Sequence, residues 1–415
     1  MPDVEVHVDF APGQKRIGTL HRHARRGEEA LSFEYHASWL DDAEHFSLEP
    51  ALPLGRGAFA PPADAAIFAS IGDSAPDTWG RRLMQRAERR RAEREHRAVR
   101  TLQELDYLLV VSDVSRLGAL RFRNVGEEAF QSPTSAAVPS LIELGRLLQI
   151  TDRILRDEET DEDMQIIFAP GSSLGGARPK ASVIDQHGRL AIAKFPKETD
   201  DYSIELWESV ALTLASRAGI RTPDHELIRV AGRPVMLTRR FDRTEHARVP
   251  FLSALSMLGL KDGERGSYPE LVDVLTRYGS QARQDAREIY RRMIMNILIS
   301  NVDDHLRNHG FLWGGRDGWT LSPAYDLNPT PTDVRPRILT TNISLDEATC
   351  DLDLALSSAE FFAISLTEAK AIAKEVGSVV SAWRDVAAAA GATQAEIRRM
   401  ASAFEHNDLA RALAL

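Results

Sequence analysis

Three polar residues are spaced along this chain in the way that phosphoryl transfer requires. Residues 301–308 read Asn-Val-Asp-Asp-His-Leu-Arg-Asn, and Asp326 follows them. In protein kinases, one Asp accepts the proton of the substrate hydroxyl, an Asn in the same loop ligates Mg²⁺, and a later Asp holds the metal under the phosphates. Asp303 has the kinase spacing to Asn308, whereas Asp304 is one residue too close. The spacing predicts Asp303 as the base and Asn308 and Asp326 as metal ligands, and an Asx-rich turn is the alternative interpretation.

A lysine on a strand is the second part that this chemistry needs, because it neutralises nucleotide phosphates. Residues 190–195 read Leu-Ala-Ile-Ala-Lys-Phe, which is similar to the Val-Ala-Ile-Lys strand of kinases, and Lys194 is the only charged residue in them. A lysine in a buried strand needs an anionic partner. The helix predicted over residues 203–218 offers Glu205 and Glu208, of which we favour Glu208. An edge-strand lysine is the alternative interpretation.

A glycine-rich segment precedes this strand. Residues 171–180 read Gly-Ser-Ser-Leu-Gly-Gly-Ala-Arg-Pro-Lys. Backbone amides approach anions closely where side chains are small, so Gly171, Gly175 and Gly176 predict a loop over phosphates. The segment has neither the Walker A sequence nor the Gly-x-Gly-x-x-Gly of protein kinases, so an ordinary hairpin loop is the alternative. The order of glycine loop, lysine, helix glutamate, Asp-Asn pair and final Asp favours phosphoryl transfer.

Other chemistries find less support in the sequence. His305 and His309 are four residues apart, but no further histidine or cysteine accompanies them nearby in the sequence, so a zinc site is not favoured. Cys350 is the single cysteine, so it forms no internal disulfide, and the protein is expected in a reducing compartment. The sequence around Cys350 does not indicate a cysteine protease. The N-terminal residues are acidic and polar, unlike a signal peptide, and no apolar run approaches the ~18 residues of a membrane span. We therefore expect a cytoplasmic protein with no membrane partner.

Composition and charge indicate a soluble globular protein. Its 415 residues are 43% hydrophobic and 27% charged, which predicts two or three packed units. The net charge of −10 argues against indiscriminate coating of nucleic acid. Arginines crowd residues 81–100 and are interleaved with Glu88, Glu93 and Glu95. This pattern predicts a solvated helix with side-chain pairs, and a surface for phosphates or an acidic partner is the alternative.

The hydrophobic pattern predicts a strand-rich half followed by a helical half. Early strands are expected at residues 4–10, 16–20 and 30–35, followed by helices at 81–100, 101–112 and 141–156, an acidic connector at 157–163 and a short strand at 165–168. Residues 181–185 and 190–195 predict a hairpin, 226–230 and 234–238 two more strands, and everything beyond about residue 243 helices. Among these helices, 286–300 has one buried face, and capping boxes open two others at Ser365 and Thr393.

With these residues assembled, the chain resembles the HipA family of bacterial serine/threonine kinases, the toxins of HipBA-type toxin–antitoxin pairs. The resemblance covers nearly the whole chain. It rests on the motifs at residues 172–180, 193–196, 240–243, 303–308 and 323–326, and on residues 72–80 for the N-terminal part. It implies an α+β, two-lobed protein-kinase-like fold with an extra N-terminal subdomain at 1–125, a strand-rich ATP-binding part at 126–243 and an all-helical C-terminal lobe at 244–415.

The resemblance also implies a role for each matching residue. Asp303 would be the catalytic base, Asn308 and Asp326 would hold Mg²⁺, Phe241 would lie at the adenine hinge and Asp242 near the ribose. Arg239 stands where family hinges often carry an acidic residue. The full set expected to bind ATP is Lys194, Gly175, Gly176, Ala177, Phe241, Asp242, His305 and Tyr325.

Self-inactivation is a further implication of the resemblance. The serine that opens the glycine loop is autophosphorylated in relatives. Ser173 occupies this place and Ser172 is adjacent, so both are candidates. A phosphoserine carries roughly −1.5 to −2 charge, and here that charge would lie where the phosphates of ATP belong. Phosphorylation of this loop is therefore expected to silence the enzyme.

Partners follow from the resemblance as well. Characterised relatives phosphorylate aminoacyl-tRNA synthetases, which arrests growth and produces persistence, and they bind a small helix-turn-helix antitoxin that contacts operator DNA. We therefore expect a serine/threonine kinase that uses ATP and Mg²⁺, a protein substrate, a HipB-like antitoxin and operator DNA bound through that antitoxin. Two other hypotheses stay open: a pseudokinase that holds antitoxin and DNA through residues 81–100, and a small-molecule kinase. The intact set of Lys194, Asp303, Asn308 and Asp326 speaks against a pseudokinase.

Overall fold

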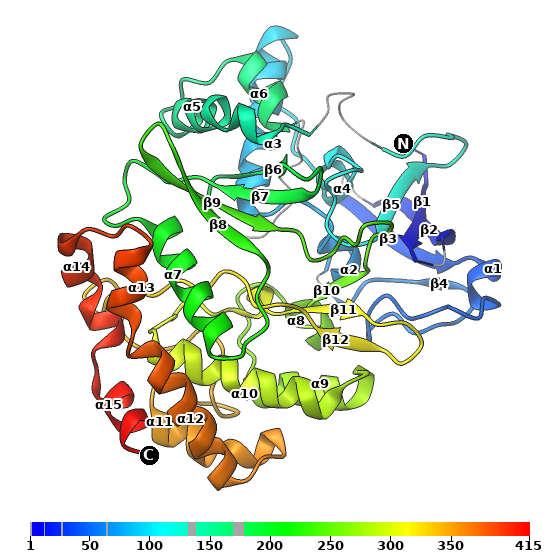
Figure 1. The fold of residues 1–415 in the computed structure, drawn as a ribbon. Coiled ribbons are helices and arrows are strands. Elements are labelled where there is room, and N and C mark those ends of the chain that lie inside the picture. Colours follow the sequence, from blue (N-terminus) through cyan, green and yellow to red (C-terminus); the bar gives the residue numbers. More distant parts are fainter. Residues whose placement is uncertain (1, 12, 26–27, 64, 132–137, 169–177) are drawn as a thin grey trace. The chain divides into compact units, whose positions relative to one another are not determined.

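The computed structural model describes residues 2–11, 13–25, 28–63, 65–131, 138–168 and 178–415 (Figure 1). These residues form two compact units. The first comprises residues 1–198, 230–233 and 239–252, and the second comprises 199–229, 234–238 and 253–415. Helices and strands occur in both units, which confirms the α+β class. The predicted division into three parts, at residues 1–125, 126–243 and 244–415, stays a prediction.

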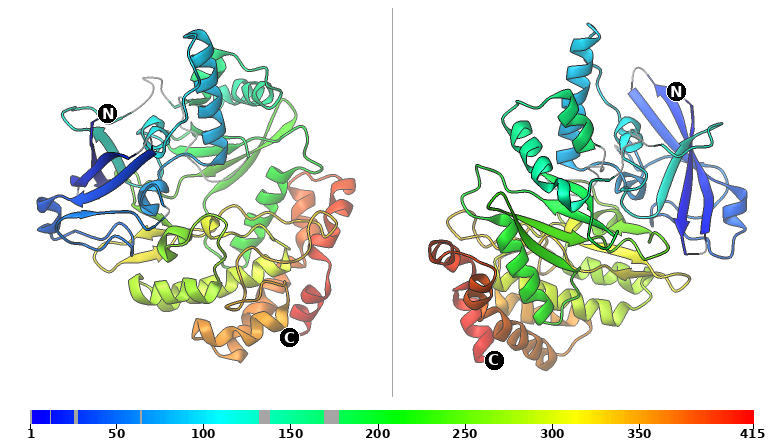
Figure 2. Two further views of the ribbon diagram at one scale, coloured as in Figure 1. Left: turned by 180° about the vertical axis from the view of Figure 1, so that it is seen from behind. Right: turned by 45° about the horizontal axis from the view of Figure 1, so that its top comes forward.

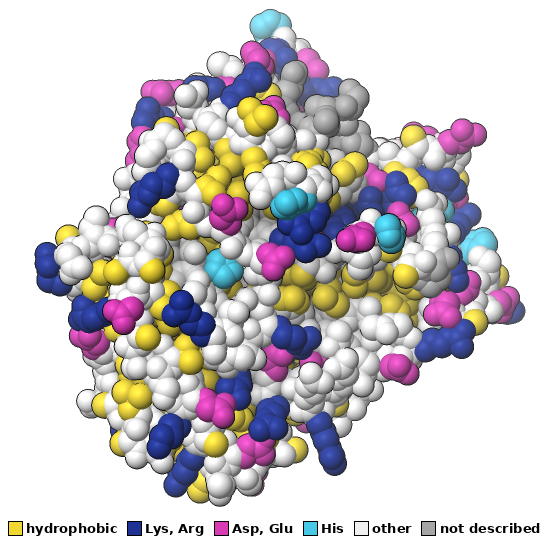
Figure 3. All heavy atoms as spheres, viewed as in Figure 1, with side chains coloured by type: hydrophobic (Ala, Val, Ile, Leu, Met, Phe, Trp, Pro, Cys, Tyr) yellow, Lys and Arg dark blue, Asp and Glu magenta, His cyan; other side chains and the backbone are white. Residues whose placement is uncertain are grey.

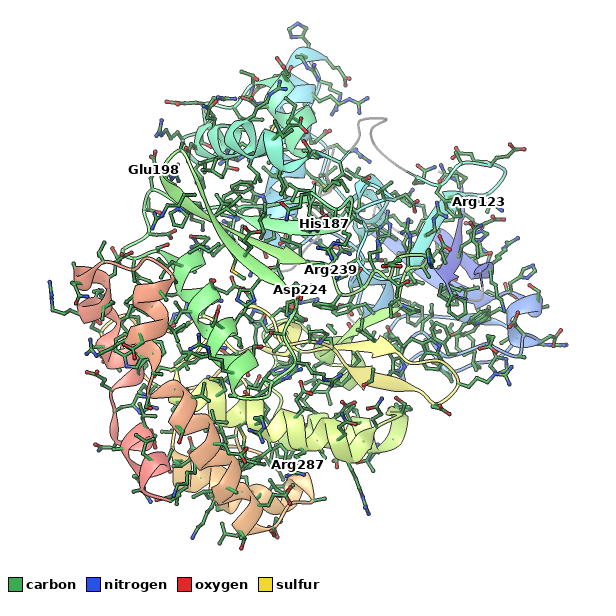
Figure 4. The ribbon with its side chains drawn as sticks, viewed as in Figure 1. Arg123, His187, Glu198, Asp224, Arg239 and Arg287 are labelled. Carbon is green, nitrogen blue, oxygen red and sulfur yellow. The ribbon has the colours of Figure 1, made fainter. Side chains whose placement is uncertain are left out.

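The first unit begins with a five-stranded antiparallel sheet in the order β4-β3-β2-β1-β5. Its strands are β1 (Val4–Phe10), β2 (Gly13–Arg25), β3 (Glu28–Tyr35), β4 (Ala58–Phe59) and β5 (Leu120–Asn124). Glu5 on β1 lies on the opposite face from Val4, Val6 and Val8, and it is buried because Arg123 and Arg16 pair with it at 2.5 and 2.9 Å (Figure 4). Ion pairs therefore cover the second face of this central strand.

Helices follow the sheet in the first unit. They are α1 (Ala37–Leu40), α2 (Ala69–Gly72), α3 (Thr78–Arg94), α4 (Glu104–Val110), the 3₁₀ turn η1 (Leu141–Glu143), α5 (Leu144–Leu155) and α6 (Asp161–Phe168). The strand predicted at 165–168 is wrong, because these residues end α6. Thr160 and Asp163 exchange hydrogen bonds of 2.9 and 3.1 Å at its start. Acidic residues in a first turn favour a helix, so the predicted acidic connector is partly helical too.

The arginine-rich helix α3 is matched by acids of the same unit. Arg86 pairs with Asp157 at 2.6 Å and with Glu159 at 3.3 Å, and Arg94 pairs with Asp161 at 3.0 Å. Basic side chains accordingly lie next to acidic ones over α3, at the top of Figure 3. The helix ends at Arg94, earlier than the predicted end at residue 100. Arg91 in its last turn pairs with the C-cap residue Glu95 at the expected i,i+4 spacing. Much of this positive charge is therefore balanced within the chain.

A β-hairpin completes the nucleotide-binding part that the sequence predicts. Strands β6 (Lys180–Ile184) and β7 (Leu190–Lys194) pair antiparallel, which confirms the predicted hairpin. The backbone amide of Asp185 donates to the carbonyl of Arg189 at 2.8 Å and closes the turn. The backbone amide of Arg240 donates to the carbonyl of Leu190 at 3.0 Å, so the chain returns beside β7 before the predicted hinge residues.

The second unit is mostly helical but not entirely. Its helices are α7 (Ile204–Arg217), α8 (Ala254–Leu258), α9 (Tyr268–Tyr278), α10 (Ala282–Leu298), α11 (Leu352–Ser357), α12 (Leu366–Val380), α13 (Trp383–Ala389), α14 (Gln394–Phe404) and α15 (Asn407–Ala414), with 3₁₀ turns η2 (Leu306–Asn308) and η3 (Ala359–Phe362). Its core includes Trp207, Trp383 and Phe404, the last two stacked at 4.5 Å. Thr393 opens α14 with the predicted capping box, and Ser365 caps α12 through its side chain, which accepts from the backbone amide of Glu368.

The prediction of an all-helical C-terminal lobe is wrong. Within residues 244–415 the chain forms β10 (Phe251–Ser253) and, after the predicted catalytic loop, β11 (Gly310–Trp313) and β12 (Trp319–Leu321). The two strands predicted at 226–230 and 234–238 are confirmed as β8 (His225–Val230) and β9 (Arg233–Arg239). Trp313 and Trp319 lie directly opposite in this hairpin, with ring centroids 5.3 Å apart. Gly315 and Gly318 have positive φ angles of 93° and 110°, which a tight turn of this kind requires. These strands are too short to show a clear period in the sequence.

Helix α10 is the central helix of the second unit, as its sequence predicts. Ile289, Met293, Ile294 and Ile297 are fully buried on it. It packs against α9 and α12, and the views of Figure 2 show these helices side by side. Arg287, labelled in Figure 4, reaches from α10 to Glu368 on α12 at 2.9 Å. Within the described residues, none of the helices has both the length and the apolar character that a membrane span demands.

Candidate active site

The predicted catalytic loop begins where α10 ends. Ser300 has a φ of +52°, which is uncommon for a residue other than glycine. Its hydroxyl donates to the carbonyl of Ala403 at 2.8 Å and accepts from Nε of Arg337 at 3.0 Å. Backbone strain of this kind persists only where the surroundings hold it, and it is common at functional sites. The loop is therefore anchored at its first residue.

The two adjacent aspartates of the loop lie in opposite environments. The side chain of Asp303 is 52% exposed and that of Asp304 is 2% exposed. The carboxylate of Asp304 accepts from the hydroxyl of Tyr268 and lies 3.0 Å from Nε2 of His309. Burial alone would raise the pKa of Asp304, but the charge and hydrogen bond of His309 and the bond from Tyr268 outweigh it and lower that pKa. Asp304 is thus a structural residue, and Asp303 presents its carboxylate at the surface.

Asp303 forms an ion pair with an arginine of the same unit. Its Oδ1 accepts from Nη1 of Arg335 at 2.9 Å, and the side chain of Arg335 is 57% exposed. An exposed ion pair of this kind contributes typically 0.2–1 kcal/mol, because water screens it and both side chains lose freedom. The pair is therefore weak enough for a substrate hydroxyl to compete with it.

Asn308 is held by the loop itself. Its backbone amide donates to the carbonyl of His305 at 2.7 Å, and its side-chain nitrogen donates to the carbonyl of Asp303 at 3.1 Å. The second bond fixes the amide and leaves its oxygen for another ligand. Asn308 lies in η2 and is buried. Nδ1 of His305 is buried and has no hydrogen-bond partner among the described residues.

Asp326 lies in a strained backbone conformation next to this loop. Its φ is +59°, and its backbone oxygen and Oδ1 each accept from the side-chain nitrogen of Asn328 at 3.2 Å. The hydroxyl of Tyr325 donates to the carbonyl of Arg307 at 2.8 Å. The backbone amide of Asn328 donates to Oδ1 of Asn301 at 3.0 Å. The structure thus brings the Tyr325-Asp326 segment and the loop of Asn308 together, as the kinase layout predicts.

A buried polar chain that the sequence analysis missed supports both segments. Asn301 donates to Oδ1 of Asn296 at 3.0 Å, and Asn296 donates to the hydroxyl of Tyr268 at 2.9 Å. Tyr268 then donates to Asp304. Asn296 could have been noticed as a polar residue on an apolar helix, because a buried amide needs partners. Tyr268 gave no such signal, since its partners are distant in the sequence.

The remaining predicted residues that the structure describes belong mainly to the first unit. Lys194 is the last residue of β7, and Phe241 lies with its ring centroid 6.3 Å from that of Phe251. Asp242 is 1% exposed and accepts from the backbone amide of Gly118 at 2.7 Å. These positions agree with a hairpin and a hinge segment in one unit. The ATP contacts assigned to Lys194 and Phe241 stay predictions.

Asp242 is enclosed by two guanidinium groups. Arg240 and Arg243 donate to its carboxylate at 2.5 and 2.7 Å. Burial opposes its ionisation, but the charges of the two arginines outweigh this effect and lower the pKa of Asp242 to about 2. These contacts give Asp242 a structural role. Its expected place near the ribose stays a prediction.

Some predicted residues are not tested by the structure. Glu208 and Glu205 are both buried on α7 of the second unit, whereas Lys194 belongs to the first, so the pairing of Lys194 with Glu208 stays a prediction. The glycine-loop residues Ser172, Ser173, Gly175, Gly176 and Ala177 lie outside the described residues. In the part of the chain that is described, no three His, Cys, Asp or Glu side chains cluster as a metal site.

Comparison with known proteins identifies the family. The model of the HipA-like C-terminal domain matches residues 172–396, and that of the HipA N-terminal domain matches residues 9–123. The chain therefore belongs to the HipA family. A chain in the solved complex of HipA, HipB and operator DNA from the Shewanella oneidensis toxin–antitoxin system is similar over 99% of this chain and 96% of that chain, with a TM-score of 0.63 and 15% identity. This likeness confirms the expected fold.

Curated relatives match shorter stretches. A Sinorhizobium fredii protein named "Putative kinase Y4dM" is 30% identical over 138 residues, which are 30% of this chain and 33% of that protein. A Haemophilus influenzae protein named "Putative kinase" is 23% identical over 181 residues, which are 38% of this chain and 52% of that protein. The matches thus span between a third and about half of the length of these relatives.

Proposed function

We propose that this chain is a serine/threonine protein kinase that uses ATP and Mg²⁺ and acts as the toxin of a toxin–antitoxin pair. One observation carries the proposal: of two adjacent aspartates in the loop, Asp304 is buried in a hydrogen-bonded network and Asp303 is exposed. A base must reach the proton that it accepts, so the exposed carboxylate is the one suited to this role. The order of the other parts along the chain supports the same class of reaction.

Residues of the second unit are suited to act as the catalytic base and as the metal ligands. The carboxylate of Asp303 accepts the proton of a serine or threonine hydroxyl as that oxygen attacks the terminal phosphate of ATP. The carboxylate of Asp326 and the amide oxygen of Asn308 are oxygen donors, which Mg²⁺ prefers, and Mg²⁺ usually takes only one or two protein carboxylates together with substrate phosphates and waters. When bound, Mg²⁺ neutralises charge on the phosphates.

The residues of the first unit suit the nucleotide. Lys194 neutralises the phosphates, and Phe241 provides an apolar surface for adenine. We also propose that His305, Tyr325 and the glycine-loop residues Gly175, Gly176 and Ala177 bind ATP, as the family resemblance implies. Phosphorylation of Ser173, or of the adjacent Ser172, would place negative charge where the phosphates bind and would silence the enzyme.

The partners are proposed from the family and from the solved relative. The Shewanella oneidensis complex contains HipA, HipB and operator DNA. A HipB-like helix-turn-helix antitoxin that contacts operator DNA is therefore the proposed partner of this chain. The proposed substrate is a translation component such as an aminoacyl-tRNA synthetase in the cytoplasm, whose phosphorylation arrests growth and produces persistence.

Transfer of labelled phosphate tests the reaction class. The full chain is incubated with ATP labelled in the terminal phosphate, alone and with a bacterial lysate, in Mg²⁺ or in excess chelator. Label on a serine or threonine of the chain or of a lysate protein, in Mg²⁺ only, is the expected result. Absence of labelled protein under every condition, with the chain shown to be folded, would overturn the proposal. Phosphoproteomics of expressing cells then identifies the substrate.

A further inference from the structure

Two arginines of the segment between β12 and α11, Arg335 and Arg337, lie in different surroundings. All three side-chain nitrogens of Arg337 donate to partners within the second unit, which are the hydroxyl of Ser300 (3.0 Å), the carboxylate of Asp408 (2.7 Å) and the carbonyl of Ile297 (2.8 Å). Each of these bonds holds the segment against the start of the predicted catalytic loop. Arg337 is therefore a structural residue.

Arg335 is instead presented at the surface. Its side chain is 57% exposed, and its Nη1 donates to Oδ1 of Asp303 at 2.9 Å. A guanidinium group carries five N–H donors in a planar fork, and such a fork binds a carboxylate through two parallel hydrogen bonds. The bond to Asp303 employs one of the five donors. Arg335 can therefore bind the carboxylate of another molecule beside the proposed base.

The segment that carries Arg335 is anchored on both sides of it, although residues 332–336 are exposed. Before Arg335, the backbone amide of Thr332 donates to the hydroxyl of Ser402 on α14 at 3.1 Å. After it, Arg337 fixes the segment as described above. Binding to a segment whose backbone is already in place costs less conformational freedom. An exposed but anchored arginine is thus suited to recognition.

The distance between Arg335 and Asp303 limits which part of a substrate Arg335 can reach. A base lies about 2.6–3.2 Å from the hydroxyl oxygen whose proton it accepts. Arg335 lies 2.9 Å from the same carboxylate, so its guanidinium group comes within roughly 6–8 Å of that oxygen. An extended chain advances ~3.3–3.6 Å per residue. Arg335 therefore reaches side chains one or two positions from the acceptor residue.

We propose that Arg335 determines specificity by binding an Asp or Glu that lies within two positions of the phosphorylated serine or threonine. The role rests on the proposed kinase function. In the free chain, Arg335 occupies Oδ1 of Asp303. A substrate carboxylate that binds Arg335 frees this oxygen for the acceptor hydroxyl. A lysine or arginine at the same place is rejected, because like charges there repel each other.

The sites that the chain labels provide the first test. The full chain is incubated with a bacterial lysate, Mg²⁺ and ATP labelled in the terminal phosphate, and the labelled residues of lysate proteins are located by mass spectrometry. The sites that are labelled fastest are expected to carry Asp or Glu within two positions. Fastest sites without an acidic residue there overturn the role of Arg335.

Arg335→Gln tests the residue itself, with the fastest-labelled lysate protein as purified substrate. The variant is expected to lower kcat/KM by about tenfold, mainly through a higher KM, because a charge-assisted hydrogen bond to the substrate is lost. Arg411→Gln is the matched control, since Arg411 is similarly exposed and pairs with Asp353 in the same unit. The control should act like wild type. Equal kcat/KM in the two variants would disprove the proposal.

Replacement of the substrate's acidic residue gives a second measurement that leaves the fold of the kinase untouched. Its change to Gln should lower kcat/KM with the wild-type chain about as much as Arg335→Gln does with the original substrate. Both changes together should cost little more than either alone, because they remove the same contact. Charge reversal, with Arg335→Glu and a lysine in the substrate, should recover part of the loss. Independent losses that multiply would contradict direct recognition.

These results separate the specificity role from the function on which it rests. If the wild-type chain labels no protein, the proposed kinase function fails and the role of Arg335 fails with it. If the wild type labels proteins and Arg335→Gln labels them equally well, the kinase proposal stands and only the role of Arg335 is disproved.

Discussion

Removal of one buried hydroxyl group should show whether the polar network under the proposed catalytic loop does more than ordinary core packing. Tyr268 is fully buried on α9, where its hydroxyl donates to the carboxylate of Asp304 and accepts from the side-chain nitrogen of Asn296 at 2.9 Å. Tyr268→Phe keeps the ring and removes both bonds. Asp304 then keeps His309 as a side-chain partner, and the amide of Asn296 loses one acceptor.

The expected cost follows from the kinds of bond that are lost. A hydrogen bond to a charged group contributes about 1.5–3 kcal/mol and a neutral one about 0.5–1.5 kcal/mol. Tyr268→Phe should therefore lower the free energy of unfolding by about 2–4 kcal/mol. Tyr290→Phe is the matched control, because Tyr290 is equally buried in the same unit and its hydroxyl donates to one neutral acceptor, the carbonyl of Ala355, at 3.0 Å. Its expected cost is about 1 kcal/mol.

Urea denaturation of both variants measures this difference, and labelled phosphate transfer measures its effect on the loop. Tyr268→Phe should lose at least about 1 kcal/mol more than Tyr290→Phe, since only Tyr268 bonds a charged group. It should also transfer phosphate more slowly than the control at a temperature where both remain folded. Equal stability and equal transfer rates in the two variants would refute the view that this network positions the catalytic loop.

Three further changes have expected outcomes. Asp242→Asn leaves the buried guanidinium group of Arg240 and the partly buried one of Arg243 without a carboxylate, and it should lower the free energy of unfolding by about 3–5 kcal/mol in urea denaturation. A loss below about 1 kcal/mol contradicts the structural role. The hydrogen bond from Arg153 lowers the pKa of Asp163 from 3.8 to about 2. The stabilising contribution of Asp163 is therefore present above about pH 4 and is lost toward pH 2. Circular dichroism of acid unfolding should show this loss of stability between about pH 4 and pH 2 in wild type and not in Asp163→Asn. Gly318→Ala should lower the melting temperature more than Gly315→Ala, because both have positive φ but only at Gly318 would a Cβ meet the last carbonyl of α9; equal effects contradict this clash.

Local patterns were sufficient to predict several elements of this protein. The apolar spacing of residues 286–300 predicted α10, and the alternation around Asp185–Arg189 predicted the β6–β7 hairpin. Each of these signals lies within one element, where period and turn chemistry act directly. The spacing to Asn308, a local property, singled out Asp303 as the candidate base, and Asp303 is the exposed aspartate of the two.

The features that the sequence did not reveal depend on distant partners. The spacing separates Asp303 from Asp304 as a base, but it does not show that Asp304 is buried against Tyr268 and His309. The pairing of Lys180 with Asp77 joins residues about a hundred positions apart, so no local period reports it. The prediction of a strand at 165–168 was wrong for a different reason. An apolar run this short fits both the helical and the strand period, and the acidic first turn of α6 favours the helix.

The central claim is that Asp303 performs the chemistry and Asp304 maintains the structure. The most direct measurement compares three variants in the second unit, Asp303→Asn, Asp304→Asn and the exposed control Asp317→Asn, by melting temperature and by labelled phosphate transfer. Asp303→Asn should melt like wild type and lose transfer by about 10²–10⁴-fold, because only a weak surface pair is lost while the base is removed. Asp304→Asn should melt at a clearly lower temperature, and Asp317→Asn should match wild type in both. Phosphate transfer by Asp303→Asn at the wild-type rate would contradict the account.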